Sequence, residues 1–229
     1  KVPFHFMEHG TFNNYTPTYR ETHSHWYVCG DIPNPNINIE LSGINTNMGQ
    51  LHERMQGTCM ALGNIEVYGF HSADHGPIAD FCNSLLDFLG IPTHASQLLT
   101  EGLVGGAQYV ASTGGQIICE AFSRGCLVLQ NAIENAISKG AKPALFYANF
   151  LAPPRLPSNA KYDYSTTMSS RDGVTIASRV MNFFSPDSRN KIETGQGMLF
   201  LDHYYDNNVY SKGHQRDYID YSLKLLSER

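Results

Sequence analysis

The sequence contains no long hydrophobic run and no recognisable targeting signal. No apolar stretch approaches the roughly 18 residues that a helix needs to span a bilayer, and no signal-peptide pattern is present. Internal repeats and low-complexity tracts are also missing. These absences favour an ordinary globular protein without a transmembrane segment. Because the chain opens at Lys1 without a methionine, it can be a trimmed fragment whose targeting segment is not shown.

Cysteine is scarce, and its spacing does not match a disulfide or zinc motif. The cysteines are odd in number, form no C-x-x-C pair, and at least three lie inside apolar periodic segments (Cys29, Cys59, Cys82, Cys119 and Cys126). Buried free thiols in a reducing compartment are therefore expected. We expect a soluble protein that resides in a reducing cytoplasm or is secreted into a host cell.

Positive charge is scarce as well. The formal net charge is -5, and the basic residues are spread thinly, so the sequence has no electrostatic footprint for nucleic acid. The glycines around Gly102 have neither phosphate-loop spacing nor a following Lys-Ser/Thr pair. We therefore expect no nucleic-acid partner and no cofactor.

Apolar runs of strand length alternate with helical segments along the chain. Strands are expected near residues 3–8, 37–42, 64–70, 116–122, 143–150, 179–185 and 197–203, and helices near 48–62, 77–89, 95–111, 126–138 and 214–227. This alternation is typical of an α/β fold with a mostly parallel central sheet and helices on both faces. With 229 residues and an apolar share of 41%, the chain predicts one domain over 1–229, with long covering loops near 11–36 and 151–173.

The segment QIICEAFSRGCLVLQNA, residues 116–132, carries the strongest functional signal. A short β-branched run breaks at Ser123-Arg124-Gly125 and then takes up helical periodicity. This pattern indicates a strand, a tight turn and a helix, as in the G-x-S-x-G nucleophile elbow of serine hydrolases. Ala121 replaces the first glycine of that motif and Gly125 keeps the second. The alternative is a serine that only caps a helix.

Polar residues follow several of the predicted strands. In an open parallel sheet, ligands bind beyond the carboxyl ends of the strands, so these residues form one candidate site. The chain order is Ser123, then Asp187 after the second predicted strand past it, then His203 at the end of the third. This is the order of nucleophile, acid and base in the α/β-hydrolases.

The chain resembles the α/β-hydrolase superfamily of lipases and esterases. More narrowly, four segments resemble a family of functionally unassigned hydrolase-like domains from obligate intracellular bacteria: SGINT at 42–46, AFSRG at 121–125, FFSPD at 183–187 and FLDHYYDNNVY at 200–210. The resemblance covers roughly residues 37–225. It implies a Ser–His–Asp triad and an ester-like or amide-like substrate.

Each residue of the expected triad has a separate role. Ser123 is the candidate nucleophile, and His203 is the candidate base that accepts its proton. His214, in the following YSKGHQRD segment, is the alternative base. Asp187 is the candidate acid that orients the imidazole. An ion pair between Asp187 and an arginine is the alternative role, and Asp202 and Asp206 are the alternative acids.

The expected oxyanion hole consists of two backbone N–H groups. Arg124, which follows the nucleophile, supplies one of them. In this superfamily the other comes from the loop after the strand two before the nucleophile strand. Counting back from 116–122 through 64–70 reaches 37–42, which places the donor at Ile44 or Asn45.

A second histidine cluster follows the strand at 64–70. His71 and His75 are expected to line the substrate cleft, and no metal is expected. The alternative is a zinc hydrolase that uses His71, Asp74 and His75, although H-S-A-D-H lacks the central histidine of the metallo-β-lactamase motif. The sequence as a whole predicts a serine hydrolase for an ester, thioester or lipid acyl bond. The alternative function is a hydrolase-derived binding module without turnover.

Overall fold

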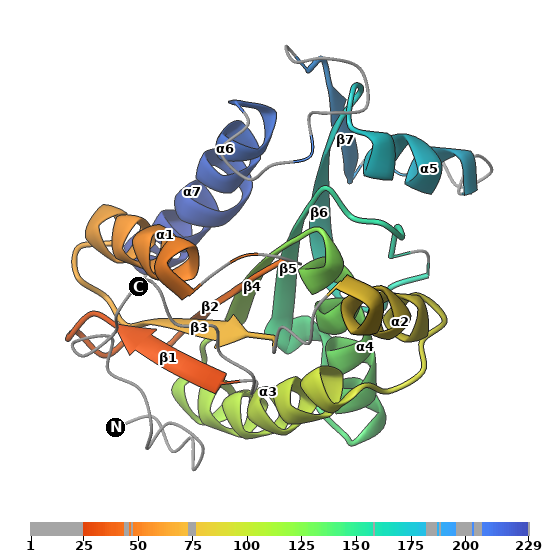
Figure 1. Cartoon of the computed structure of the whole chain (residues 1–229). Coiled ribbons are helices and arrows are strands. Elements are labelled where there is room, and N and C mark those ends of the chain that lie inside the picture. The colour runs from red at the N-terminus through yellow and green to blue at the C-terminus, as the bar shows by residue number, and fades with distance from the viewer. Residues whose placement is uncertain are drawn as a thin grey trace.

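The computed structural model describes residues 25–43, 46, 48–72, 77–157, 159–181, 187, 189–195, 203 and 208–228 (Figure 1). In these residues a seven-stranded sheet has the order β1-β3-β2-β4-β5-β6-β7. The strands are β1 His25–Cys29, β2 Ile37–Leu41, β3 Val67–His71, β4 Ile117–Phe122, β5 Phe146–Leu151, β6 Asp163–Ser169 and β7 Asn190–Glu193. Only β1 is antiparallel to its neighbour, and the other five pairings are parallel.

Helices cover both faces of this sheet (Figure 1). They are α1 Met48–Ala61, α2 Pro77–Phe88, α3 His94–Thr113, α4 Arg124–Ser138, α5 Gly173–Met181, α6 Asn208–His214 and α7 Asp220–Ser227, with a 3-10 turn η3 at Pro143–Leu145 and a π-helical turn η4 at Gln215–Ile219. Figure 1 shows α1 and α7 on one face and α3 and α4 on the other. The predicted α/β class with a mostly parallel sheet is confirmed.

Two apolar cores correspond to these two faces. The larger core joins α3 and α4 to one side of the sheet through residues such as Leu99, Leu129 and Ile39. The smaller core joins α1 and η4 to the other side through residues such as Met55 and Tyr218. Strands buried on both faces are rich in apolar residues, and the apolar residues of 37–42, 64–70, 116–122 and 143–150 made these strands predictable.

The end signals of α3 are also visible in the sequence. Thr93 caps the helix, because its hydroxyl accepts from the Ser96 amide while the Ser96 hydroxyl accepts from the Thr93 amide. The helix stops at Gly114, whose φ of 72° is left-handed. This capping box and the glycine stop confirm the helix predicted near 95–111.

The predicted loop at 151–173 is wrong, because it contains strand β6. All but the first residue of Asp163–Ser169 are buried, yet most are serine or threonine. Two of these hydroxyls bond to neighbouring strands: that of Ser165 to Asn149 on β5 and that of Thr166 to Asn190 on β7. A polar strand satisfied in this way gives no apolar signal. The predicted loop at 11–36 likewise includes β1, and its first fourteen residues lie outside the described part.

The strand predicted at 179–185 is also wrong over residues 179–181, the part that the structure describes. Helix α5 runs through Gly173–Met181, so the segment begins as helix. Short apolar runs do not separate a strand from a buried helix by themselves. The predicted strand 3–8 and nearly all of 197–203 lie outside the described residues, and β7 was not predicted.

A group of buried charged side chains lies between the sheet and α1. Glu40 on β2 and Glu120 on β4 are register partners, and neither is exposed to solvent. Arg54 of α1 reaches both: its Nη2 lies 3.5 Å from Glu120 Oε1 and its Nε lies 3.9 Å from Glu40 Oε2. The Thr58 hydroxyl donates to Glu40. Two carboxyl groups side by side in the core can ionise only with cations close by, and Arg54 of α1 supplies one.

No helix among the described residues is long and apolar enough to cross a bilayer. This finding agrees with the short apolar runs of the sequence.

Candidate functional site

Ser123 occupies a strained turn between β4 and α4. Its φ of 54° and ψ of -126° are unusual for a residue with a side chain, and such strain often occurs at functional sites. The turn is held because the Ser123 amide donates to the Leu151 carbonyl at 2.9 Å. A Cβ atom at Gly125 would lie 2.6 Å from the Ser42 carbonyl oxygen, so only glycine fits there. These are the steric conditions of a nucleophile elbow.

The Ser123 hydroxyl contacts His203, which is 80 residues later in the chain. His203 Nε2 lies 2.7 Å from Ser123 Oγ. The imidazole stacks on the Phe122 ring, with centroids 5.1 Å apart and an interplanar angle of 28°. Phe122 therefore supports the ring that its neighbour Ser123 contacts.

The other ring nitrogen of His203 contacts Asp172. Nδ1 lies 2.7 Å from Asp172 Oδ2, so one imidazole bridges the serine hydroxyl and a carboxylate. Asp172 is fully buried. Burial alone would raise the pKa of Asp172, but hydrogen bonds from His203, Tyr210 and the Val174 amide lower it below its usual value. Asp172 is therefore held as a carboxylate.

Asp172 is placed by the start of helix α5. Its Oδ1 accepts from the Val174 amide at 2.8 Å and from the Thr175 amide at 3.4 Å. These are helix-capping hydrogen bonds. An aspartate directly before a helical segment, as in DGVTIAS, was a usable sequence signal for this position. It was missed because 151–173 was taken as a loop.

Asp187, the expected acid, does not contact His203. Its carboxylate accepts from Arg189 Nη2 at 2.6 Å and from the Tyr164 hydroxyl at 2.9 Å. The ion pair that was the alternative role for Asp187 is therefore the contact it makes. The strand count explains the error: with β6 included, the second strand after Ser123 ends at Ser169, just before Asp172. Asp202 and Asp206 lie outside the described residues.

His214, the alternative base, lies in the buried charged group. Its Nδ1 is 2.7 Å from Glu120 Oε1. Burial alone would lower the pKa of His214, but the charge and hydrogen bond of Glu120 raise it above the usual value. The same contact lowers the pKa of Glu120 against the opposing effect of burial. His214 therefore contacts Glu120 on β4, and His203 contacts Ser123, which directly follows that strand.

The His214–Glu120 contact predicts a pH-dependent stability. A histidine whose pKa is raised on folding stabilises the fold fully below its unfolded pKa, near 6.5, and loses this contribution as pH rises through the folded pKa. The difference in free energy of unfolding between wild type and His214→Gln should therefore shrink from about pH 6 to about pH 9. Urea unfolding across this range measures it. Exposed His94→Gln is the matched control, and an equal trend in both variants would contradict the prediction.

Of the expected oxyanion-hole donors, only Arg124 lies among the described residues. Arg124 begins α4, and the first amides of a helix have no acceptor within the helix. The loop after β2 adjoins the serine, because a Cβ at Gly43 would lie 3.3 Å from Ser123 Cβ. The Gly43 amide is used inside that loop, where it donates to Thr46 Oγ1 at 3.2 Å. Ile44 and Asn45 lie outside the described residues.

The Arg124 side chain points into a buried ionic contact. Its Nε donates to Asp87 Oδ2 at 3.1 Å, and its Nη1 lies 4.0 Å from Asp80 Oδ1. Asp87 also accepts from the Thr93 hydroxyl at 2.7 Å. Helix α2 is therefore tied to the first residue of α4, directly beside Ser123. The sequence pattern predicted only a backbone role for Arg124 and gave no signal of this ionic contact.

His71 ends strand β3 and is buried. Its Nδ1 lies 3.3 Å from the Ser42 hydroxyl, which places it beside the loop that adjoins Ser123. His75, the other expected cleft residue, and Asp74 lie outside the described residues. In the part of the chain that the structure describes, no three histidine, cysteine, aspartate or glutamate side chains are grouped to hold a metal ion.

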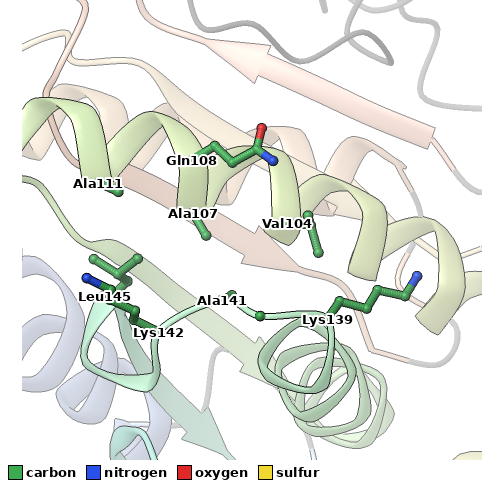
Figure 2. Close-up of a pocket in the computed structure, with 9 residues that line it drawn as sticks. Val104, Ala107, Gln108, Ala111, Lys139, Ala141, Lys142 and Leu145 are labelled. Atoms are coloured by element: carbon green, nitrogen blue, oxygen red, sulfur yellow. The ribbon is translucent and has the colours of Figure 1, made fainter.

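A surface pocket of about 210 Å³ lies at the far end of α4 from Ser123. Figure 2 shows Val104 and Ala107 of α3 facing the segment 139–145 that joins α4 to β5. Helix α4 begins at Arg124 and ends at Ser138, which is a length of about 20 Å at 1.5 Å per residue. This pocket is therefore separate from the serine site.

Comparison with known proteins identifies the fold. No protein-family model matches the chain, and no curated protein matches it significantly. Among solved structures, a predicted CIB-like hydrolase from Thermoplasma acidophilum is 12% identical, with a TM-score of 0.50 over 88% of this chain and 94% of that chain. Dienelactone hydrolase from Anabaena variabilis is 13% identical, with a TM-score of 0.48 over 90% and 91%.

The likeness to the Thermoplasma protein agrees with the architecture described above. At 12% identity, the likeness to the Thermoplasma protein concerns the fold alone. Together with the mostly parallel sheet, it shows an α/β-hydrolase-like fold. The narrower resemblance to a family from obligate intracellular bacteria stays a prediction.

Proposed function

We propose that the protein is a serine hydrolase in which Ser123 is the nucleophile, His203 the general base and Asp172 the acid. The observation that carries the proposal is the unbroken chain of contacts from Ser123 Oγ through His203 to Asp172, with both distances 2.7 Å. Asp172 takes the place that sequence analysis gave to Asp187. The strained turn at Ser123 is the second support.

The proposed reaction begins with attack of Ser123 Oγ on the substrate carbonyl carbon. A serine hydroxyl is too weakly acidic to attack unaided, so its proton moves to His203 Nε2 as the Oγ–C bond forms. Asp172 fixes the imidazole with Nδ1 protonated and offsets the positive charge that develops on the ring. His203 then returns the proton to the leaving group, and water hydrolyses the acyl-enzyme by the same steps.

Negative charge on the carbonyl oxygen needs donors that are already in place. The Arg124 amide at the start of α4 is one proposed donor, and the Ile44 or Asn45 amide in the loop after β2 is the other. The approach of Gly43 to Ser123 supports this location. Each such donor contributes about 3–4 kcal/mol to stabilisation of the transition state. The pair Arg124–Asp87 holds the first donor in position.

The proposed substrate is a small-molecule ester or thioester, or a lipid acyl chain, and the reaction needs no cofactor. His71 and His75 are proposed to line the substrate cleft. The second candidate function is a binding module that keeps the fold without turnover. A zinc hydrolase that uses His71, Asp74 and His75 is the remaining alternative.

An active-site-directed fluorophosphonate probe tests the proposal. The wild type should become labelled, and Ser123→Ala should lose all labelling because the nucleophilic oxygen is absent. His203→Ala should lose labelling as well, because Ser123 then has no base. Circular dichroism and thermal unfolding show that both variants remain folded.

Two controls separate the alternatives. His214→Ala should keep labelling if it folds, because His214 contacts Glu120 and not Ser123. Labelling and ester turnover should persist after exhaustive EDTA treatment, since a serine triad activates its nucleophile by proton transfer. No labelling of folded wild type would support the binding module. Turnover by Ser123→Ala that requires added zinc would support the metal alternative.

A further inference from the structure

We propose that Tyr210 is a positioning residue that fixes the orientation of the Asp172 carboxylate and weakens the electrostatic attraction between that carboxylate and the His203 ring. This inference rests on the proposed function, because it assigns a role within the same hydrogen-bonded chain. Tyr210 lies in α6, and its ring is fully buried.

The Tyr210 hydroxyl is itself fixed from two sides. It donates to Asp172 Oδ2 and accepts from the Ser169 amide at 3.4 Å. Ser169 is the last residue of β6, so the sheet determines where the hydroxyl lies. A buried tyrosine hydroxyl normally finds such a partner, but here the partner is the proposed catalytic acid.

With Tyr210 present, both oxygens of the Asp172 carboxylate accept two hydrogen bonds. Oδ1 accepts from the amides of Val174 and Thr175. Oδ2 accepts from His203 and Tyr210. A carboxylate held by four donors cannot rotate about its χ2 angle without breaking several of them. Its orientation toward His203 Nδ1 is therefore determined before substrate binds.

Tyr210 also supports His203 through an aromatic neighbour. The Phe122 ring packs edge-on against Tyr210, with centroids 5.5 Å apart, and stacks on the His203 ring. Phe122, Tyr210, Val209, Leu151 and Ala152 form a small apolar core of their own. One side chain thus contacts the acid directly and the base through Phe122.

The position of α6 leaves little freedom for this contact. A Cβ atom at Gly213 would lie 2.6 Å from Thr167 Oγ1 and 2.9 Å from Leu151 Cδ2, so the helix is packed closely on β5 and β6. The Gly213 carbonyl accepts from Asn149 Nδ2 at 3.3 Å. The helix therefore places Tyr210 at a defined distance from the carboxyl end of β6.

The hydrogen bond has a predictable electrostatic consequence. A neutral donor on Oδ2 disperses part of the negative charge that faces His203 Nδ1. Removing the donor should concentrate that charge on the His203 side, and the free enzyme should hold the histidine proton more tightly.

The variant Tyr210→Phe tests this role. We expect kcat for an activated ester to fall about tenfold with KM changed less than about twofold, because one positioning hydrogen bond is lost. The acidic limb of the kcat/KM profile should move up by about half to one pH unit. The control Tyr162→Phe removes a buried hydroxyl that has no hydrogen-bond partner in the described structure, and it should change neither quantity.

A second measurement does not depend on turnover. The low-field proton signal of His203 Nδ1–H, assigned by its loss in His203→Ala, should shift in Tyr210→Phe and not in Tyr162→Phe. If Tyr210→Phe does not fold, 3-fluorotyrosine at position 210 provides the test. Its more acidic hydroxyl should strengthen the bond and move the acidic limb to lower pH.

The outcomes separate this inference from the proposed function. Wild type that neither labels nor turns over contradicts the proposed function, and a shifted low-field signal in Tyr210→Phe would still support positioning. Ser123-dependent labelling together with an unchanged signal, pH profile and kcat in folded Tyr210→Phe would overturn the role of Tyr210 alone. A fall in kcat that follows thermal stability in both phenylalanine variants, without a shift of the acidic limb, would also overturn it.

Discussion

Asp172→Asn should lower kcat for an ester substrate about 10⁴-fold while the protein stays folded. Asparagine keeps the size of the side chain and can still cap α5 through its carbonyl oxygen. If its amide group faces His203, it offers N–H where Nδ1–H needs an acceptor, which favours the imidazole with the proton on the wrong nitrogen. His203 Nε2 would then be unable to take the Ser123 proton. Steady-state kinetics on purified, folded variant measures the effect.

Asp187→Asn is the matched control for this result. Asp187 contacts Arg189 and Tyr164 and does not contact His203, so kcat should stay within about twofold of wild type. The Arg189 guanidinium holds the pKa of Asp187 well below its usual range, and this effect belongs to the surface ion pair. A large loss in Asp187→Asn with normal activity in Asp172→Asn would restore the original assignment and reject the acid proposed above.

Arg54→Met should destabilise the fold by about 3–5 kcal/mol at neutral pH, the usual effect of removing one partner from a buried ion pair. The Arg54 side chain is 8% exposed, and Glu40 and Glu120 are not exposed at all. Methionine preserves most of the length of arginine but leaves His214 as the nearest cation for two carboxylates. Chemical denaturation of both proteins measures the difference in free energy of unfolding.

The pH dependence identifies the cause of this loss. Burial already raises the pKa of Glu40, against the opposing charge of Arg54, and removing Arg54 should raise it further. A carboxyl whose pKa is raised on folding loses stability as pH rises above its unfolded pKa. The deficit of Arg54→Met should therefore be smaller near pH 5 than near pH 8. Arg189→Met, at a half-exposed ion pair, should lose at most about 1 kcal/mol, and a similar loss in both variants would contradict the prediction.

Much of the site could be predicted because its signals are local. A strand, a turn with Ala121 and Gly125, and a helix leave a recognisable pattern around Ser123, since the steric limits of the turn act on neighbouring residues. His203 was named from the order of the three residues along the chain and from its place at the end of a predicted strand, and the structure brings it to the serine. The polar strand β6 was not predictable from apolar periodicity, because its serine and threonine hydroxyls find partners only in the folded sheet and in the segments packed on it.

The sequence by itself determined the fold class, the helices on both faces and the turn that carries Ser123, because buried parallel strands and tight turns constrain nearby residue types. Only the tertiary structure decided which carboxylate meets His203 and which histidine meets Ser123. Asp187 follows an apolar segment whereas Asp172 follows the polar strand β6, and His203 and His214 are close in sequence. Which aspartate and which histidine reach the site depends on two features of the packing: β6 enters the sheet between β5 and β7, and α6 packs beside β6. Contacts across 31 and 80 residues arise from that packing, and no local pattern encodes them.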